Sequence, residues 1–191
     1  MKIDLTEIYK GLAEWRAERG ITAESQKEGY IVNVMEELGE LASALREYER
    51  FSKPSYPYLK NKKYAEHGII DALCDISVFT INAGADIPCY NKPTRLELEP
   101  CLSLDNLLKE IADHQRCFNS ITLCYVLGVC ASLCHQYGFN FEIAMLETIK
   151  EISSRTGAYD ENAKKWVKDE SNEARAKWYK ADYEKARIAQ C

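Results

Sequence analysis

No apolar run in the 191 residues approaches the roughly 20 residues that a membrane-spanning helix needs. The amino-terminal stretch MKIDLTEIYKGLAEW mixes polar and apolar residues and lacks the continuous apolar segment of a secretory signal. An excess of positive charge is also missing, because the formal net charge is -5 and the isoelectric point is about 5.4. These absences predict a cytoplasmic protein that binds neither a membrane nor a nucleic-acid polymer. A few Lys and Arg residues could still form a local phosphate site.

The C-x-x-C pairs of common zinc sites are missing from the sequence, although it contains eight cysteines. Cys124, Cys130 and Cys134 occupy the apolar stretch TLCYVLGVCASLCHQ, where reduced cysteine packs as a small hydrophobic residue. We therefore expect free thiols in a core rather than a zinc site or a disulfide framework. Cys191, the last residue, is expected to lie in solvent.

Strand alternation longer than a few residues, fixed-period repeats and low-complexity tracts are absent as well, and helical periodicity dominates. The length and the hydrophobic content of 46% suit one domain spanning residues 1–191. Helices are predicted over 4–19, 27–50, 62–85, 105–116 and 119–137, and again after the turn at Gly138. A connection with three prolines precedes the fourth helix, which Ser103 or Asp105 should cap. The sequence therefore predicts an all-α bundle with a charged tail.

Acidic residues recur at helical spacing inside two of these segments. Glu36, Glu37 and Glu40 fall within an arc of about 100° in NVMEELGELASALREYER. Asp71 and Asp75 stand four apart in the hydrophobic stretch EHGIIDALCDISVFTINAG, so they project together. Buried carboxylates are costly unless positive charge meets them. Because carboxylate oxygens suit hard cations, the two segments together suggest a Mg²⁺ site between two helices.

Two other interpretations of these acids need separate consideration. The three glutamates could form a solvated face that Lys27 or Arg46 balances, and the sequence leaves this alternative open. A ferritin-like di-iron centre requires Glu-x-x-His on two helices of a bundle. None of the three histidines follows a glutamate at that spacing, so we do not predict a di-iron centre.

In these residues the sequence resembles the all-α NTP pyrophosphohydrolases, the superfamily that includes MazG-like enzymes and the dimeric dUTPases. Their signature is E-E-x-x-E on one helix and E-x-x-D on the next, and here EELGE and GIIDALCD supply its parts. The stretches EISSRTGAYDENAKKWVKD and KWYKADY resemble the carboxy-terminal segment that these proteins fold over the triphosphate. The resemblance runs from about Trp15 to Tyr183 and is weakest over 86–118. It departs from the family at Gly68, where the family has Glu.

The resemblance implies a single helical bundle of the all-α NTP pyrophosphohydrolase type, whose charged carboxy-terminal segment folds over the site. The implied reaction is Mg²⁺-dependent hydrolysis of a (deoxy)nucleoside triphosphate to a monophosphate and pyrophosphate, in a homodimer or homotetramer. Glu36 is the candidate for orienting or deprotonating the attacking water. The candidate metal ligands are Glu37, Glu40, Asp71 and Asp75. The candidate substrate contacts are Asn33, Asn82 and Trp15 for the sugar or base, and Arg155, Lys165 and Lys168 for the phosphates.

Several alternatives stay open at this point. Gly68 puts one metal ligand in doubt, although His67 and Asp75 lie near the Asp71 face of the helix and could compensate. A nucleotide-binding protein without turnover is therefore one alternative function. A structural helical oligomerisation module with solvated acids is the other. For Trp15, core packing is favoured over a contact with the base.

Overall fold

The computed structural model describes residues 2–53, 59–88, 92–99, 102–160 and 165–189, without the side chains of residues 59, 60, 159 and 165. Within this part of the chain, seven α-helices carry most of the regular structure and two small sheets accompany them. The prediction of a mostly helical fold is confirmed. No helix in the described ranges is long and apolar enough to cross a membrane.

The helices are α1 (Thr6–Arg19), α2 (Ala23–Phe51), α3 (Leu59–Ala83), α4 (Leu104–Arg116), α5 (Ser120–Gln136), α6 (Phe141–Ser154) and α7 (Asn172–Arg175), and a short 3-10 helix follows at Tyr183–Ala186. Helices α1 to α6 follow the predicted segments to within a few residues, whereas α7, in the charged tail, was not predicted. Local signals set several of the ends. Gly20 ends α1 with a left-handed φ of 63°, a conformation that glycine adopts at little cost. Ser103 caps α4, and its backbone N–H donates to the Asn106 side chain at 2.9 Å.

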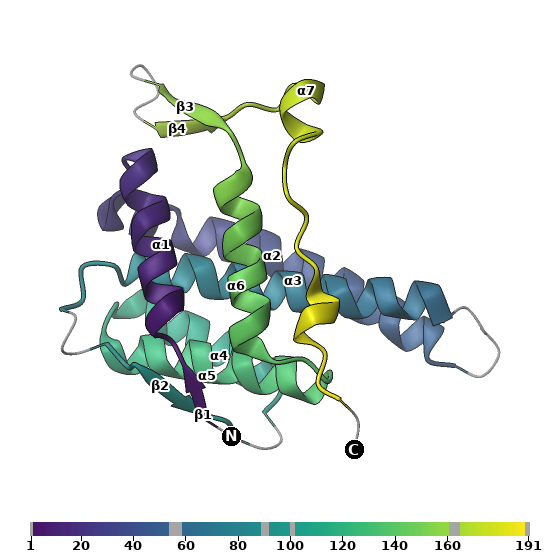
Figure 1. Cartoon of the computed structure of the whole chain (residues 1–191). Helices are drawn as coiled ribbons and strands as arrows, with labels where there is room; N and C mark the ends of the chain where they lie inside the picture. Colours follow the sequence, from purple (N-terminus) through teal and green to yellow (C-terminus); the bar gives the residue numbers. More distant parts are fainter. Residues whose placement is uncertain (1, 54–58, 89–91, 100–101, 161–164, 190–191) are drawn as a thin grey trace.

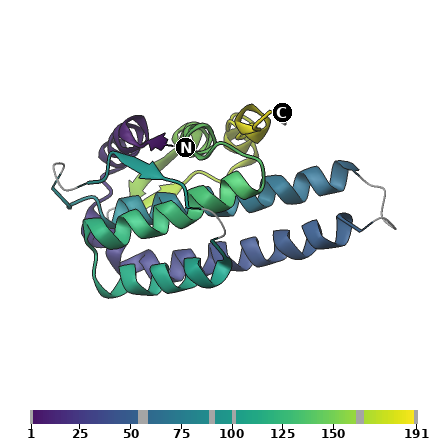
Figure 2. The same cartoon turned by 90° about the horizontal axis from the view of Figure 1, so that it is seen from below.

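A long antiparallel hairpin of α2 and α3 forms the centre of the fold. Helix α4 packs against both α2 and α5, and α5 packs against α3, so these four helices form a bundle with α2 and α4 on one side and α3 and α5 on the other (Figure 2). Helices α1 and α6 and the carboxy-terminal segment run across the α3 and α5 side of that bundle (Figures 1 and 2). The far ends of α2 and α3 extend beyond the other helices (Figure 1).

Two contacts fix the register of the α2–α3 hairpin. The Tyr30 hydroxyl lies 3.2 Å from Thr80 Oγ1 near one end. Further along, α3 approaches α2 so closely that a Cβ built on Gly68 would lie 3.2 Å from the Cβ of Ala44. Between these contacts, residues 36–41 of α2 must run antiparallel past residues 71–75 of α3. The hairpin therefore brings the two acidic segments side by side.

Apolar residues of α3 and α5 supply much of the core, in which the cysteines take part. Cys130 and Cys134 are buried free thiols and Cys124 is a half-buried one, as the apolar context predicts. Cys74 on α3 is also a buried free thiol. Cys191 falls outside the described residues.

Two short antiparallel sheets were not predicted. Strand β1 (Lys2–Asp4) pairs with β2 (Arg95–Glu97), which lies inside the proline-containing connection. Strands β3 (Gly157–Asp160) and β4 (Lys165–Lys168) form a hairpin beyond the end of α6. Strands of three or four residues present too few alternations for a period of two to be recognised in the sequence.

Candidate functional site

The predicted carboxylates of α2 and α3 lie close enough together for their charges to affect one another's pKa values. Burial raises the pKa of Glu37 to about 7, and the negative charges of Glu40 and Asp71 add to the shift. Burial likewise raises the pKa of Asp75 well above its ordinary value, and the charges of Asp71 and Glu37 raise it further. The four side chains are therefore close enough to repel one another. The hairpin accordingly gathers residues that the sequence placed on separate helices.

Two of these acids have no hydrogen-bond or ion-pair partner within the described part of the chain, and the charge of Arg155 offsets only part of their raised pKa values. No described residue donates a hydrogen bond to, or forms an ion pair with, the carboxylates of Glu37 and Asp75, and both side chains are partly buried. Asp71 has a single hydrogen bond, which its Oδ1 accepts from the Tyr183 hydroxyl at 2.5 Å. Carboxylates removed from water without partners destabilise a fold, so their presence indicates a ligand with positive charge.

Glu36 and Glu40 lie at the solvent-facing side of this group. Both are exposed, whereas Glu37 is partly buried. The charges of Glu40 and Glu36 both contribute to the raised pKa of Glu37, so the two residues are its electrostatic neighbours. Glu36 is thus placed at the edge of the acidic group, where water has access.

The donor set suits Mg²⁺, because every candidate ligand is a carboxylate oxygen. Within the described residues, no three His, Cys, Asp or Glu side chains are already gathered tightly enough to hold a metal ion. Carboxylates that repel one another are expected to close around a common point only when a cation is present. The chemistry of the residues therefore fits Mg²⁺, and ion binding would require small movements of their side chains.

Helix α6 and the segment after it bring further charges to the acids. Burial raises the pKa of Asp71, whereas the Tyr183 hydrogen bond and the positive charges of Arg155 and Lys180 oppose this rise. The Glu151 carboxylate accepts hydrogen bonds from Arg155 Nη2 at 3.1 Å and from the backbone N–H of Ala181 at 2.8 Å. Arg155 is the predicted phosphate ligand that the structure brings to the acidic group.

Sequence reasoning missed Glu151, Lys180 and Tyr183 as members of this site. A signal existed for Glu151, because it stands four residues before Arg155 on a predicted helix. Nothing local shows that this helix crosses α3, or that the tail returns along it. These three residues join the site through packing between segments that are distant in the sequence.

The remaining predicted substrate residues are spread along the molecule. Asn33 is partly buried on the Glu37 face of α2. Asn82 is fully buried, and its Oδ1 accepts from Arg16 Nη1 at 2.5 Å while its Nδ2 has no partner. Trp15 packs against the core, and its Nε1 donates to the Ile152 carbonyl at 3.2 Å, which fits the packing interpretation.

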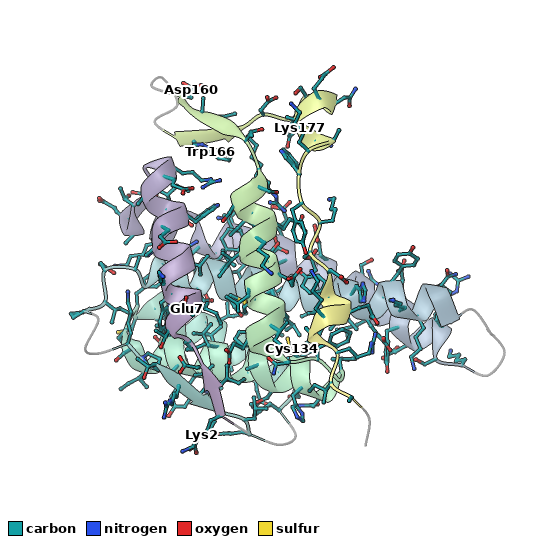
Figure 3. All side chains as sticks on the ribbon, viewed as in Figure 1. Lys2, Glu7, Cys134, Asp160, Trp166 and Lys177 are labelled. Atoms are coloured by element: carbon teal, nitrogen blue, oxygen red, sulfur yellow. The ribbon has the colours of Figure 1, made fainter. Side chains whose placement is uncertain are left out.

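The predicted phosphate-binding lysines lie on the β3–β4 hairpin. Lys168 is exposed on β4, and the side chain of Lys165 is outside the part of the chain that the structure describes. Trp166, labelled in Figure 3, anchors the hairpin. The guanidinium carbon of buried Arg19 lies 5.0 Å from the centroid of its ring. The hairpin stands beyond the ends of α1 and α6 (Figure 1), so the structure does not place Lys168 beside the carboxylates.

Neither Gly68 nor His67 supplies the acid that the family pattern expects at position 68. Gly68 lies where α2 and α3 approach closely, against Ala44. His67 Nε2 lies 2.7 Å from Glu184 Oε1, so this ring is engaged by the carboxy-terminal segment. The close approach of α2 and α3 therefore accounts for a glycine at position 68.

A double-mutant cycle between Gly68 and Ala44 tests this packing. Gly68→Ala is expected to stabilise the protein by about 1 kcal/mol in an Ala44→Gly background, because alanine favours the helix. In the native background, crowding against Ala44 should cancel that gain. Urea denaturation of the four proteins measures the coupling. Equal effects of Gly68→Ala in both backgrounds would contradict the close contact.

No protein-family model matches the chain, and no curated protein or solved structure matches it. The functional interpretation therefore depends on the residues and geometry described above.

Proposed function

We propose that the protein is a Mg²⁺-dependent nucleoside triphosphate pyrophosphohydrolase with a bundle of the all-α NTP pyrophosphohydrolase type. The observation that carries the proposal is the group of partly buried carboxylates on α2 and α3. Glu37 and Asp75 within that group have no partner among the described residues. A solvated acidic face would not show the raised pKa of Glu37 or of Asp75, which arises chiefly from burial.

The residues around this group fit distinct roles. Mg²⁺, when bound, neutralises phosphate charge and lowers the pKa of a bound water. The ion would be held by the four carboxylates that affect one another's pKa values, namely those of Glu37, Glu40, Asp71 and Asp75. Glu36, exposed beside them, accepts a proton from the attacking water or orients it.

Arg155 is the best-supported phosphate contact. Its guanidinium already lowers the pKa of Asp71, against the larger effect of burial, so it lies near the place where a metal-bound phosphate would sit. Lys180 contributes in the same direction and is an exposed cation on the same side. Lys165 and Lys168 remain proposed contacts, which would require the β3–β4 hairpin to approach the nucleotide.

A subsite for the base or sugar is proposed at Asn82, further along α3. A guanidinium only donates hydrogen bonds, so Arg16 fixes Asn82 Oδ1 toward itself and leaves Nδ2 as the free donor. A free donor suits a carbonyl oxygen on the ligand. Asn33 on the facing helix and Trp15 on α1 are proposed to complete this part of the site.

We also propose that the protein is cytoplasmic and forms a homodimer or homotetramer. Val32 and Met35 on α2 support self-association, because their exposed fractions are 68% and 65%. These side chains lie one helical turn apart and would be covered by a second copy.

The test is pyrophosphate release from a panel of deoxy- and ribonucleoside triphosphates with Mg²⁺. We expect pyrophosphate rather than orthophosphate as the product. Glu37→Gln should reduce the rate by about a thousandfold, roughly 4 kcal/mol of lost stabilisation. Glu47→Gln, which removes an exposed acid from the same helix, is the matched control and should leave the rate unchanged. Absence of pyrophosphate release with every nucleotide would contradict the proposal.

Gly68 favours a second candidate, a nucleotide-binding protein without turnover. The panel distinguishes the two functions when a Gly68→Glu variant is included. This variant should also carry Ala44→Gly, because the new side chain needs space at the helix contact. Mg²⁺-dependent nucleotide binding without turnover, with activity appearing only in that variant, would support the second candidate. No response to Mg²⁺ or nucleotide in any variant would leave a structural module.

A further inference from the structure

The carboxy-terminal segment supplies one hydrogen bond to a candidate metal ligand. Tyr183 donates its hydroxyl to Asp71 Oδ1 at 2.5 Å. The phenol oxygen also lies 3.0 Å from Thr148 Oγ1 of α6. A tyrosine hydroxyl carries one proton, so with that proton given to Asp71 the phenol oxygen can only accept from Thr148, whose single proton is shared with the Ala144 carbonyl at 3.1 Å. One of the two lone pairs of Asp71 Oδ1 is thereby engaged, and Oδ2 accepts no hydrogen bond from a described residue.

Tyr183 is held firmly in this position. Its side chain is only 4% exposed, and its ring makes an edge contact with His67 at a centroid distance of 6.0 Å. The backbone on either side is fastened as well, because Asn140 N donates to the Ala186 carbonyl at 2.7 Å and Ala181 N donates to Glu151. The phenol therefore cannot swing away from Asp71 without disturbing the packing around α6.

Buried Glu147 provides a second anchor for the same segment. Its carboxylate accepts hydrogen bonds from the Tyr179 hydroxyl, from the backbone N–H of Asp182 and from Lys185 Nζ. None of these groups is bonded to Asp71 in the described structure. Glu147 thus fixes the path of the segment, and Tyr183 is the residue of the described segment that hydrogen-bonds a candidate metal ligand.

We infer that Tyr183 is a positioning residue that selects the ion by making Oδ1 of Asp71 a poorer metal ligand than Oδ2. This inference rests on the proposed function, because it assumes that Asp71 is a metal ligand. Ca²⁺ is larger and commonly takes both oxygens of a carboxylate within six to eight ligands. Mg²⁺ takes six ligands in a small octahedron and is satisfied with one oxygen from each carboxylate. A carboxylate whose Oδ1 shares its electron density with a fixed phenol binds less well through both oxygens and therefore favours Mg²⁺ over Ca²⁺.

Tyr183→Phe tests this inference because it removes the hydroxyl and keeps the ring. Metal-free protein is titrated separately with MgCl₂ and CaCl₂, and each dissociation constant is obtained from the rise of the melting temperature. The ratio of the Ca²⁺ constant to the Mg²⁺ constant should fall by about tenfold in the variant, the usual size of an outer hydrogen-bond effect on a metal site. A purely structural loss would weaken both ions together and leave the ratio unchanged, which would overturn the inference.

Tyr179→Phe is the matched control. It removes a hydroxyl from the same segment, one that donates to Glu147 rather than to Asp71, so the ratio should stay at the native value. If Tyr183→Phe does not fold, Thr148→Val replaces it, because Thr148 steadies the phenol oxygen. That variant should shift the ratio in the same direction by a smaller factor, and an unchanged ratio would again overturn the inference. A native protein that responds to neither ion would overturn the inference and the proposed function together.

Discussion

Asp75→Asn is expected to make the metal-free protein more stable and to abolish its response to Mg²⁺. The Asp75 carboxylate is partly buried beside Asp71 and Glu37 and has no partner among the described residues. An amide of the same shape removes the cost of a charge in that place, which is worth about 1–3 kcal/mol. Urea denaturation near neutral pH, with and without Mg²⁺, measures both effects. The same substitution should lower pyrophosphate release by about a thousandfold.

The opposite changes in stability and activity are what separate a functional carboxylate from a structural one. Asp113→Asn is the control, because Asp113 is a surface acid paired with Lys109 and Arg116. Exposed pairs contribute little, so this variant should shift stability by less than about 1 kcal/mol and leave the Mg²⁺ response intact. A destabilised Asp75→Asn protein would show that the carboxylate supports the fold, contrary to the proposal.

The metal-free protein is expected to be most stable at about pH 5 and to lose stability at both lower and higher pH. Burial raises the pKa of Glu37 from 4.5 to about 7, so the folded protein retains a proton that the unfolded chain has released. Stability must therefore fall as pH rises through this window, by roughly 1–3 kcal/mol after allowance for solvent screening. Mg²⁺ should restore most of that loss at about pH 8, because it binds the ionised carboxylates.

The acidic side of the profile has a different origin. Although burial alone would raise it, the hydrogen bonds from Lys150 and Tyr179 lower the pKa of Glu147 to about 2. A lowered pKa means that the unfolded chain takes up the proton first, so this contribution is present above pH 4.5 and is lost as pH falls toward 2. Melting temperatures across pH measure both sides. Asp75 and Asp71, whose pKa values burial also raises, contribute to the same alkaline slope, so Glu37→Gln should reduce that slope without removing it and leave the acidic side as it is. An unchanged alkaline slope in that variant would assign it to the other groups.

Comparison of particular elements shows which parts of the fold local pattern can establish. The end of α2 near Arg50, the capping of α4 by Ser103 and the end of α1 at Gly20 follow from periodicity and cap residues, which act within one or two turns. The start of α2 at Ala23, capped by Thr22, lies four residues before the predicted one. Helical spacing also identified Glu37, Glu40, Asp71 and Asp75 as acids on two helix faces. Strands β1 and β2 were not predicted because each depends on a partner far along the chain.

The residues of the site show which features a local sequence pattern cannot predict. Spacing along a helix establishes that Asp71 and Asp75 point the same way, because 100° per residue is a property of the backbone. It cannot establish that Glu37 lies opposite them, since that depends on the register set by Gly68 against Ala44. Nor can it bring Tyr183 to Asp71, because that hydrogen bond joins residues 112 positions apart through the packing of α6 against α3. The chain's local chemistry established the helices and their acids, and contacts between distant segments made them one site.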